Sequence, residues 1–183
     1  PGNRPIRIDL ARQQRDEVPN DTDIVLHFAV AKAMDFELAF AANADGAAAL
    51  RETCSSAEAF LHCSSTAVYE PDDHNPRHET DPLGDSHRPM AGMQTYSISK
   101  LAGEVLVKHT AKRIGLPTVI ARLSVPYGDL YGWMTFQLMM MEHKMPIPVH
   151  TNQPTNYAPI HSDDLIRSIP YLLSLASVPA TIV

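Results

Sequence analysis

The sequence predicts an α/β protein in which helices cover a doubly wound parallel sheet. Short apolar runs rich in β-branched residues alternate with longer stretches that place apolar residues at helical spacing, which is the rhythm of βαβ units. The 183 residues are 44% hydrophobic and 20% charged. That length and composition fit one folded domain and exclude disordered, collagen-like and disulfide-scaffold classes.

The strands and helices follow from the same pattern. Six runs are predicted to form strands: Ile6–Asp9, Ile24–Ala29, Ala59–Ser64, Thr118–Leu123, Ile147–His150 and Ala180–Val183. Four stretches are predicted to form helices: Asp35–Thr53, Thr95–Ile114, Trp133–Lys144 and Ser162–Ala176. The second helix should end at Gly115, which can adopt a left-handed cap, because Pro117 cannot continue it. Pro170 should kink or break the last helix.

Two further segments carry expectations about packing. The segment Glu70–Met93 is crowded with Pro, Asp, His and Gly and is too long for an ordinary connection, so we expect a functional loop. The run Trp133–Met141 is rich in Met and aromatic residues. Its helical spacing favours a helix that packs into the core, over the alternative of a pliant wall above a substrate.

Charge and cysteine usage narrow the class of protein. Fifteen basic and 21 acidic residues give a net charge of −6, which offers no footprint for nucleic acid or for an anionic membrane surface. No apolar run approaches the roughly 18 residues of a membrane-spanning helix, and the first residues lack the apolar core of a signal peptide. We therefore expect a cytoplasmic protein that binds a small molecule. Cys54 and Cys63 are expected to be buried thiols.

The sharpest chemical motif is Tyr96-Ser97-Ile98-Ser99-Lys100 at the start of a predicted helix. Positions i and i+4 place the phenol and the ammonium on one helix face. A nearby cation favours phenolate and should lower the Tyr96 pKa, so that the phenol can act as a general acid or base. The alternative is a surface pair, and structural context decides between the two.

A cluster of hydroxyl groups supplies that context. The apolar strand that begins at Ala59 runs into Ser64, Ser65 and Thr66. Ligands of open α/β sheets bind beyond the carboxyl ends of the strands, where these hydroxyls are expected. A serine at a strand end, beside a helical Tyr/Lys pair, can polarise a carbonyl or alcohol while a hydride moves.

These residues resemble the extended short-chain dehydrogenase/reductase family, in its NAD-dependent epimerase/dehydratase group, from about Ile6 to Val183. Ser65 falls at the family's catalytic Ser or Thr, four residues before Tyr69 of a Val-Tyr pair, and Tyr96 with Lys100 matches its Tyr-x-x-x-Lys motif. Arg122–Gly128 resembles the family's Arg-x-x-Asn-x-Tyr-Gly motif. Ile160–Asp164 resembles the His-x-x-Asp motif at the start of a later helix of the family. The resemblance implies a Rossmann-type fold and the catalytic set Ser65, Tyr96 and Lys100.

The resemblance also implies residues that bind NAD or NADP. The cofactor-binding set that it suggests is Asp9, Leu10, His27, Phe28, Ala29, Lys32, Ser64, Tyr96 and Lys100. Asp9-Leu10 resembles the pair beside the adenine ring, and His27–Ala29 resembles the strand that lies along the cofactor. Lys32 matches a lysine that reaches the cofactor phosphates in the UDP-galactose 4-epimerase branch. Asn43 and Gly46 resemble an Asn-x-x-Gly on the next helix.

The sequence departs from the family pattern at its beginning. The family opens with a strand, a Gly-x-x-Gly-x-x-Gly turn and a helix that hold the pyrophosphate, and none of these is present. In the strand order 3-2-1-4-5-6, the run Ile6–Asp9 would be separated from Ile24–Ala29 by two strands. We therefore expect an internal portion of a longer polypeptide. The choice between NAD and NADP depends on residues beyond the second family strand and is not readable.

Site residues narrow the reaction that the resemblance implies. Family members that dehydrate sugars follow the catalytic Ser/Thr with Asp-Glu, whereas this chain has Thr66 and Ala67. The branch that epimerises and reduces GDP-sugars carries a cysteine base at the position of Ala67. The remaining reactions are alcohol/ketone oxidoreduction and 4-epimerisation through a transient ketone. The non-enzymatic alternatives are a nucleotide-binding relative without catalysis and an inert fragment.

Substrate, organisation and partners complete these expectations. Thr66, Val125 and Tyr157 are the expected substrate-side residues; Val125 replaces the motif's Asn and Tyr157 replaces an arginine that clamps a diphosphate, so a smaller or more apolar substrate is favoured.

Residues 1–128 should form a partial dinucleotide-binding core and residues 129–183 a substrate-side segment with a returning helix and strand. No metal site is expected in the polar loop. The resemblance implies a homodimer that pairs through the helices Asp35–Thr53 and Thr95–Ile114.

Overall fold

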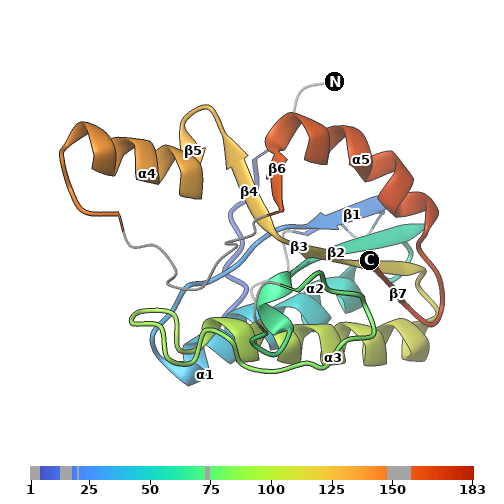
Figure 1. Ribbon diagram of the computed structural model, residues 1–183. Helices are drawn as coiled ribbons and strands as arrows, with labels where there is room; N and C mark the ends of the chain where they lie inside the picture. Colours follow the sequence, from blue (N-terminus) through green and yellow to red (C-terminus); the bar gives the residue numbers. More distant parts are fainter. Residues whose placement is uncertain (1–4, 13–17, 20, 73–74, 148–157) are drawn as a thin grey trace.

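A parallel four-stranded sheet forms the centre of the protein. The computed structural model describes residues 5–12, 18–19, 21–72, 75–147 and 158–183. The main sheet has the strand order β1-β2-β3-β7 (Figure 1). Its strands are β1 (Ile24–His27), β2 (Ala59–Ser65), β3 (Thr118–Leu123) and β7 (Thr181–Ile182). All three pairings are parallel, which confirms the predicted fold class.

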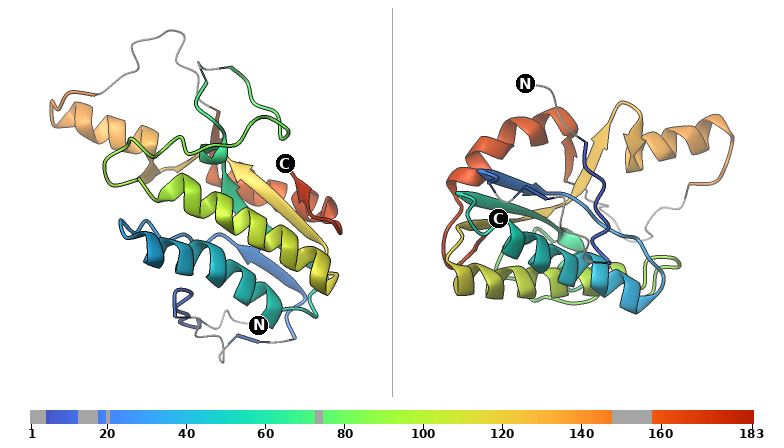
Figure 2. Two further views of the ribbon diagram at one scale, coloured as in Figure 1. Left: turned by 90° about the horizontal axis from the view of Figure 1, so that it is seen from below. Right: turned by 180° about the vertical axis from the view of Figure 1, so that it is seen from behind.

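Helices lie on both faces of this sheet. The first helical segment is continuous but changes its winding: α1 (Phe36–Phe40), a π-helical turn η1 (Ala41–Asp45) and α2 (Gly46–Thr53). It lies beside α3 (Tyr96–Ile114) on one face, and α5 (Ser162–Ser174) lies across the other (Figures 1 and 2). A Cβ on Gly103 of α3 would come within 2.6 Å of the Asn43 carbonyl oxygen, so only glycine permits this close packing of α3 on η1.

A second, smaller sheet continues from the first. Strand β4 (Val125–Gly128) follows β3 after one residue, pairs antiparallel with β5 (Tyr131–Gly132) and pairs parallel with β6 (Pro159–His161). The helix α4 (Trp133–Glu142) extends from this sheet away from the main body (Figure 1). A 3-10 turn, η2 (Thr66–Val68), follows β2 directly.

The core lies between the main sheet and the layer formed by α1, η1, α2 and α3. Phe60 of β2 and Ile120 of β3 are fully buried in its hydrophobic clusters. The opposite face is more open, because Ile24 and Leu26 of β1 are 46% and 43% exposed.

The capping prediction at the end of α3 is confirmed. The helix ends at Gly115, whose φ is 73° and whose N–H donates to the carbonyl of Ala111 at 2.9 Å. The loop Glu70–Met93 forms no helix in its described part, and its contact with the body includes a bridge between Tyr69 and Leu83.

The prediction of a strand at Ile6–Asp9 is wrong. Residues 6–9 form no strand, and none of the strands in the described part of the chain pairs with them, β1 included. The Asp9 carboxylate accepts the backbone N–H groups of Ala11 and Arg12, which closes a turn, and Leu10 packs against Gly46 at the start of α2. A strand pairs its backbone N–H and C=O groups with a neighbouring strand, and this segment lies beside a helix instead. Of the predicted strand Ile147–His150, only Ile147 is described, and it is not in a strand.

The structure also bears on two predictions about the later helices. The prediction at Pro170 was a kink or a break, and α5 runs through Pro170 without a break. The carbonyl that proline leaves unpaired, that of Ile166, belongs to a residue that is 62% exposed and can bond water. Helix α4 has no buried residue, so it is not a core helix, because it extends from the small sheet instead of lying on the main one. Within the described residues no helix is long and apolar enough to span a membrane.

Candidate active site

A cavity of about 880 Å³ opens beyond the carboxyl ends of β2 and β3. Residues far apart in the sequence line it together: Lys32, Ser65, Thr66, Tyr96 and Val125. They come from the segment after β1, from the end of β2, from η2, from the first turn of α3 and from the start of β4. This is the position at which open α/β sheets bind ligands. The structure therefore brings five of the predicted site residues to one place.

Ser65 and Tyr96 both line the larger cavity. The Ser65 side chain accepts the Ala67 N–H at 3.2 Å and so caps η2. Burial raises the pKa of the Tyr96 phenol, and hydrogen bonding with the Ser65 side chain opposes that rise. The hydroxyl groups of Ser65 and Tyr96 therefore lie within hydrogen-bonding reach of each other.

Lys100 is buried one helical turn below Tyr96, but it does not lower the Tyr96 pKa in this structure. Its Nζ donates to the carbonyl oxygen of Cys63 at 2.5 Å. Burial lowers the pKa of the Lys100 ammonium. The expectation that Lys100 lowers the Tyr96 pKa is therefore wrong for this structure. The ammonium of Lys100 is hydrogen-bonded to a strand-end carbonyl, and burial has the largest effect on the Tyr96 pKa. Cys54 and Cys63 are buried free thiols, as predicted.

Asn43, which with Gly46 resembles the family's Asn-x-x-Gly, holds the backbone of Ala31, next to Lys32. The Asn43 side chain accepts the Ala31 N–H at 2.7 Å and donates to the Ala31 carbonyl at 2.8 Å and to Ser99 Oγ at 3.0 Å. Its amide thus ties the segment after β1 to α3. The π-helical turn aims this side chain, and such turns occur frequently at functional sites.

A second cavity, of about 390 Å³, lies on the other side of that segment. Asp9, Leu10 and Ala29 line it together with Ala31 and Asn43. The predicted adenine-side residues therefore meet, although Asp9 and Leu10 lie in a turn rather than at the end of a strand. The segment from Ala29 to Lys32 runs between this cavity and the larger one.

His27 and Phe28 line neither cavity. The His27 ring lies inside the protein, where its Nδ1 is 3.0 Å from Nδ1 of His62 and the two rings stack. Phe28 is 37% exposed.

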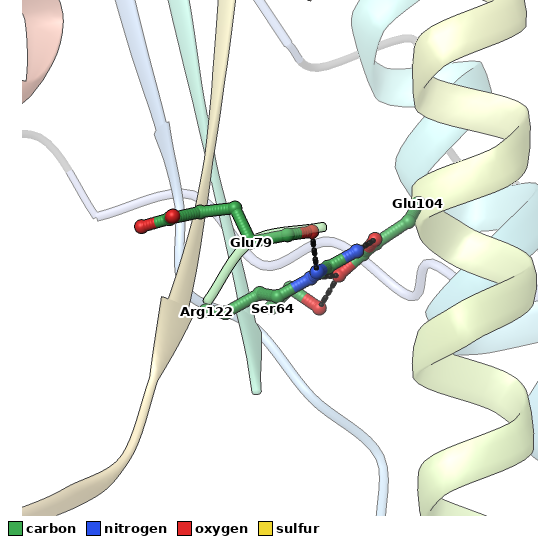
Figure 3. Close-up of polar contacts among 4 residues, drawn as sticks. All are labelled: Ser64, Glu79, Glu104 and Arg122. Carbon is green, nitrogen blue, oxygen red and sulfur yellow. Dashed lines mark hydrogen bonds and ion pairs between the residues drawn. The ribbon is translucent and has the colours of Figure 1, made fainter. Parts of the chain in front are cut away.

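Ser64 belongs to a buried polar cluster on the α3 side of the sheet (Figure 3). Its hydroxyl donates to Glu104 Oε1 at 2.6 Å. Arg122 makes a bidentate pair with Glu104, at 2.9 and 2.8 Å, and donates to the Glu79 carbonyl at 3.0 Å. Burial lowers the pKa of Arg122, but its hydrogen bonds to Glu104 and Tyr69, together with the charges of these two groups, outweigh that effect and raise it. The cluster joins β2, β3, α3 and the loop, so it supports the site from behind.

Sequence reasoning missed the loop side of the larger cavity. Ser86, His87, Met90 and Met93 line it, and no motif in the sequence marked them. The only available signal was the unusual length and composition of the loop. Tyr157, predicted on the substrate side, lies outside the described residues. In the described part of the chain, no three His, Cys, Asp or Glu residues come together as metal ligands.

Solved structures with the same fold include nucleotide-sugar enzymes. A UDP-glucuronic acid 4-epimerase from Bacillus cereus, crystallised with NAD, is 22% identical with a TM-score of 0.77, over 97% of this chain and 58% of that one. A dTDP-glucose 4,6-dehydratase, DesIV, from Streptomyces venezuelae, with NAD and TYD bound, is 20% identical with a TM-score of 0.71, over 94% and 53%. This chain thus spans little more than half of these proteins, and the likeness shows the fold.

Sequence comparison identifies the family. An uncharacterized protein of Sinorhizobium fredii, y4nG, is 32% identical over 110 residues, which are 59% of this chain and 26% of that protein. The sequence profile of the NAD dependent epimerase/dehydratase family matches residues 3–180, almost the whole chain. Its parallel sheet agrees with that match, as do Ser65 and Tyr96, which line one cavity, and Lys100, which is buried one turn further along α3. This chain belongs to the NAD dependent epimerase/dehydratase family.

Proposed function

We propose that this chain carries the catalytic residues of an NAD(P)-dependent oxidoreductase that acts on an alcohol or carbonyl carbon. The observation that carries the proposal is the meeting of Ser65 and Tyr96 in one cavity, with Lys100 buried one turn below. Both hydroxyl groups can reach a substrate oxygen in that cavity. The family, which is named for its dependence on NAD, agrees with this chemistry.

The two cavities fit the two ends of a dinucleotide. The smaller cavity, with Asp9 and Leu10, would hold the adenine end, and Tyr96 and Lys100 would hold the nicotinamide ribose. Lys32, between them, offers a cation for the phosphates. The sequence contains no Gly-x-x-Gly-x-x-Gly turn for the pyrophosphate. When bound, the nicotinamide ring supplies or accepts the hydride.

The residues of this chain would handle the proton and the substrate oxygen. Ser65 hydrogen-bonds that oxygen and orients it. Tyr96 exchanges a proton with it, and its raised pKa keeps the phenol protonated, ready to act as an acid. Lys100 must turn from the Cys63 carbonyl toward the ribose to favour phenolate, so binding of the nucleotide would activate the tyrosine.

Thr66 and Val125 indicate the class of substrate. Both line the cavity. Neither offers a charged group, so the wall near Val125 suits a carbonyl or alcohol with apolar surroundings. A second candidate is 4-epimerisation of a nucleotide sugar through a transient ketone, which the fold shared with a UDP-glucuronic acid 4-epimerase supports. Net production of NADH would separate oxidoreduction from epimerisation.

The proposal extends to a homodimer that pairs through α2 and α3. These helices lie side by side at the surface (Figure 2). Val105 of α3 is 56% exposed, and a second copy could cover it. Light scattering on the purified protein tests this, and a monomer at micromolar concentration would contradict it.

Replacing Tyr96 by Phe tests the catalytic proposal in the protein that carries this chain. Loss of the phenol should lower kcat by about 10²–10⁴-fold, because a positioned acid/base group contributes that much. Tyr171→Phe is the matched control, since Tyr171 is 66% exposed on α5, outside the cavity. If kcat of the Tyr96→Phe variant stays within about tenfold of the parent value, the acid/base role of Tyr96 is contradicted.

Nucleotide binding can be measured without knowing the substrate. Trp133 is the single tryptophan and lines the larger cavity, so NADH or NADPH bound there should quench its fluorescence. Saturable quenching that persists in the Tyr96→Phe variant would separate binding from catalysis. If neither nucleotide quenches Trp133 or shows saturable binding by calorimetry, the proposed function fails, and the non-catalytic alternative fails with it.

A further inference from the structure

His87 is a titratable residue of the larger cavity that the proposed chemistry does not use. It lies in the loop that precedes α3, and its ring is tilted against the ring of Tyr96 with centroids 5.3 Å apart. The loop is held in place just before His87. Gly84 N–H donates to the Val68 carbonyl at 2.9 Å, and Ser86 Oγ donates to the Ala67 carbonyl at 2.8 Å. His87 is therefore fixed beside the expected catalytic tyrosine.

One nitrogen of the His87 ring is already engaged. Its Nδ1 lies 3.0 Å from Ser97 Oγ and 3.1 Å from Ser86 Oγ. Ser97, which is fully buried in the first turn of α3, also accepts the backbone N–H of His87 at 3.2 Å. The same serine thus holds both the backbone and the ring, and the orientation of the imidazole is set by the helix that carries Tyr96.

The other nitrogen is free to meet a ligand. Within the described residues, Nε2 of His87 has no hydrogen-bond partner, and it is not sealed from solvent as Nε2 of His27 and Nε2 of His62 are. Burial lowers the pKa of His87, against the opposing effect of Asp85, so the ring is neutral at pH 7. A neutral imidazole with one nitrogen anchored offers a single directional hydrogen bond.

The serine network indicates which group suits Nε2. The single proton of Ser86 goes to the Ala67 carbonyl. If Ser97 donates to Nδ1, Nε2 carries the proton and is a donor; if Nδ1 donates to the serines, Nε2 is an acceptor. A hydroxyl group can accept and donate, so it fits both arrangements. A carboxylate or a plain carbonyl fits only the first.

We propose that His87 is a substrate-binding residue, whose Nε2 hydrogen-bonds a hydroxyl on the carbon next to the reacting carbon. The substrate class is then an α-hydroxy ketone or the matching vicinal diol. The adjacency of the two rings in one cavity carries the assignment, because it brings the oxygen held by Tyr96 and Ser65 close to the one held by His87, as in a substrate with oxygens on neighbouring carbons. The inference rests on the proposed function and names its substrate class.

Two ketones that differ by one hydroxyl group, hydroxyacetone and acetone, test the assignment. The protein that carries this chain is labelled with ¹⁵N-histidine and loaded with NADH, and the His87 signals are identified by their loss in the His87→Phe variant. Hydroxyacetone should shift the Nε2 signal of His87, and acetone should not. No shift, or an equal shift with both ketones, overturns the proposal.

Kinetics give a second, independent measure. In the His87→Phe variant, kcat/KM for hydroxyacetone should fall about tenfold because KM rises, since one hydrogen bond to the substrate is lost. The value of kcat/KM for acetone should stay unchanged. Ser97→Ala keeps the imidazole but frees its Nδ1, and it should lower the same preference. His109→Gln, on the exposed face of α3, is the matched control and should change nothing. An equal fall for both ketones, or a fall in kcat alone, contradicts substrate binding by His87.

The two proposals fail in different ways. If the parent protein reduces neither ketone, the kinetic arm counts against the proposed function, but the ¹⁵N signals still decide whether His87 binds the hydroxyl. If both ketones are reduced equally well and the signals do not distinguish them, the proposed function stands and the assignment of His87 is overturned.

Discussion

The helical layer on one side of the sheet and the α4 region differ in how the chain buries its side chains. In α3, eight residues are buried, among them Lys100 and Glu104. In α4, which is far more apolar in sequence, no residue is buried, and Leu138 is 64% exposed. The difference shows that burial follows the surface on which a helix lies, not its hydrophobicity. The packed layer fixes the positions of the proposed catalytic residues Tyr96 and Lys100, and the outer region contributes Trp133 to the wall of the cavity.

The largest effect is expected for ion pairs, when a buried pair of the packed layer is compared with an exposed pair on α5. Glu104→Gln removes one charge from the pair with Arg122, whose side chains are 0% and 2% exposed, and should lower the free energy of unfolding by about 3–5 kcal/mol. Asp164→Asn, in the pair with Arg167 at the surface of α5, should cost about 0–1 kcal/mol. Urea denaturation of both variants measures this. Equal losses would show that the cluster in Figure 3 is not the better-packed one.

Acid should weaken the packed layer through the buried histidine pair. Burial, followed by the charge of Lys100, lowers the pKa of His27 to about 4, and burial lowers that of His62 well below its usual value. Both are neutral in the folded protein but take up protons when unfolded. Stability is therefore fully present above about pH 6.5 and falls toward pH 4, by about 3 kcal/mol for His27 alone.

Unfolding measured across that pH range checks the sign and the size of this effect. The double replacement His27→Leu and His62→Leu should flatten the fall, because both partners of the buried contact are removed together. The exposed His109, replaced by Gln, should leave the pH dependence as it is in the parent. A pH profile unchanged by the double replacement would contradict the assignment.

The smallest effect is expected in α4. Leu138→Ala should change the free energy of unfolding by no more than about 0.5 kcal/mol, because the side chain is already exposed. The same substitution at Leu61, which is fully buried in β2, should cost about 2–5 kcal/mol. Thermal or urea unfolding compares them. A large loss at Leu138 would mean that α4 packs against another surface in solution.

The sequence by itself determined the local elements and the order of the chemical groups. Alternation of apolar runs located all four strands of the main sheet, and Gly115 with Pro117 located the end of α3. The spacing of Tyr96 and Lys100 placed them one turn apart, because that depends only on helix geometry. Ser65 could be placed for a similar reason, since strands of a parallel sheet end at a common edge.

Only the tertiary structure decided what each side chain meets. The run Ile6–Asp9 has the pattern of a strand but packs near α2, and β4, β5 and β6 depend on pairing between short segments that carry little pattern of their own. Lys100 contacts a carbonyl instead of the phenol, and His87 joins the cavity from a loop without a motif. Such contacts arise from long-range packing and desolvation, which depend on residues distant in the chain and so are not written in any local pattern.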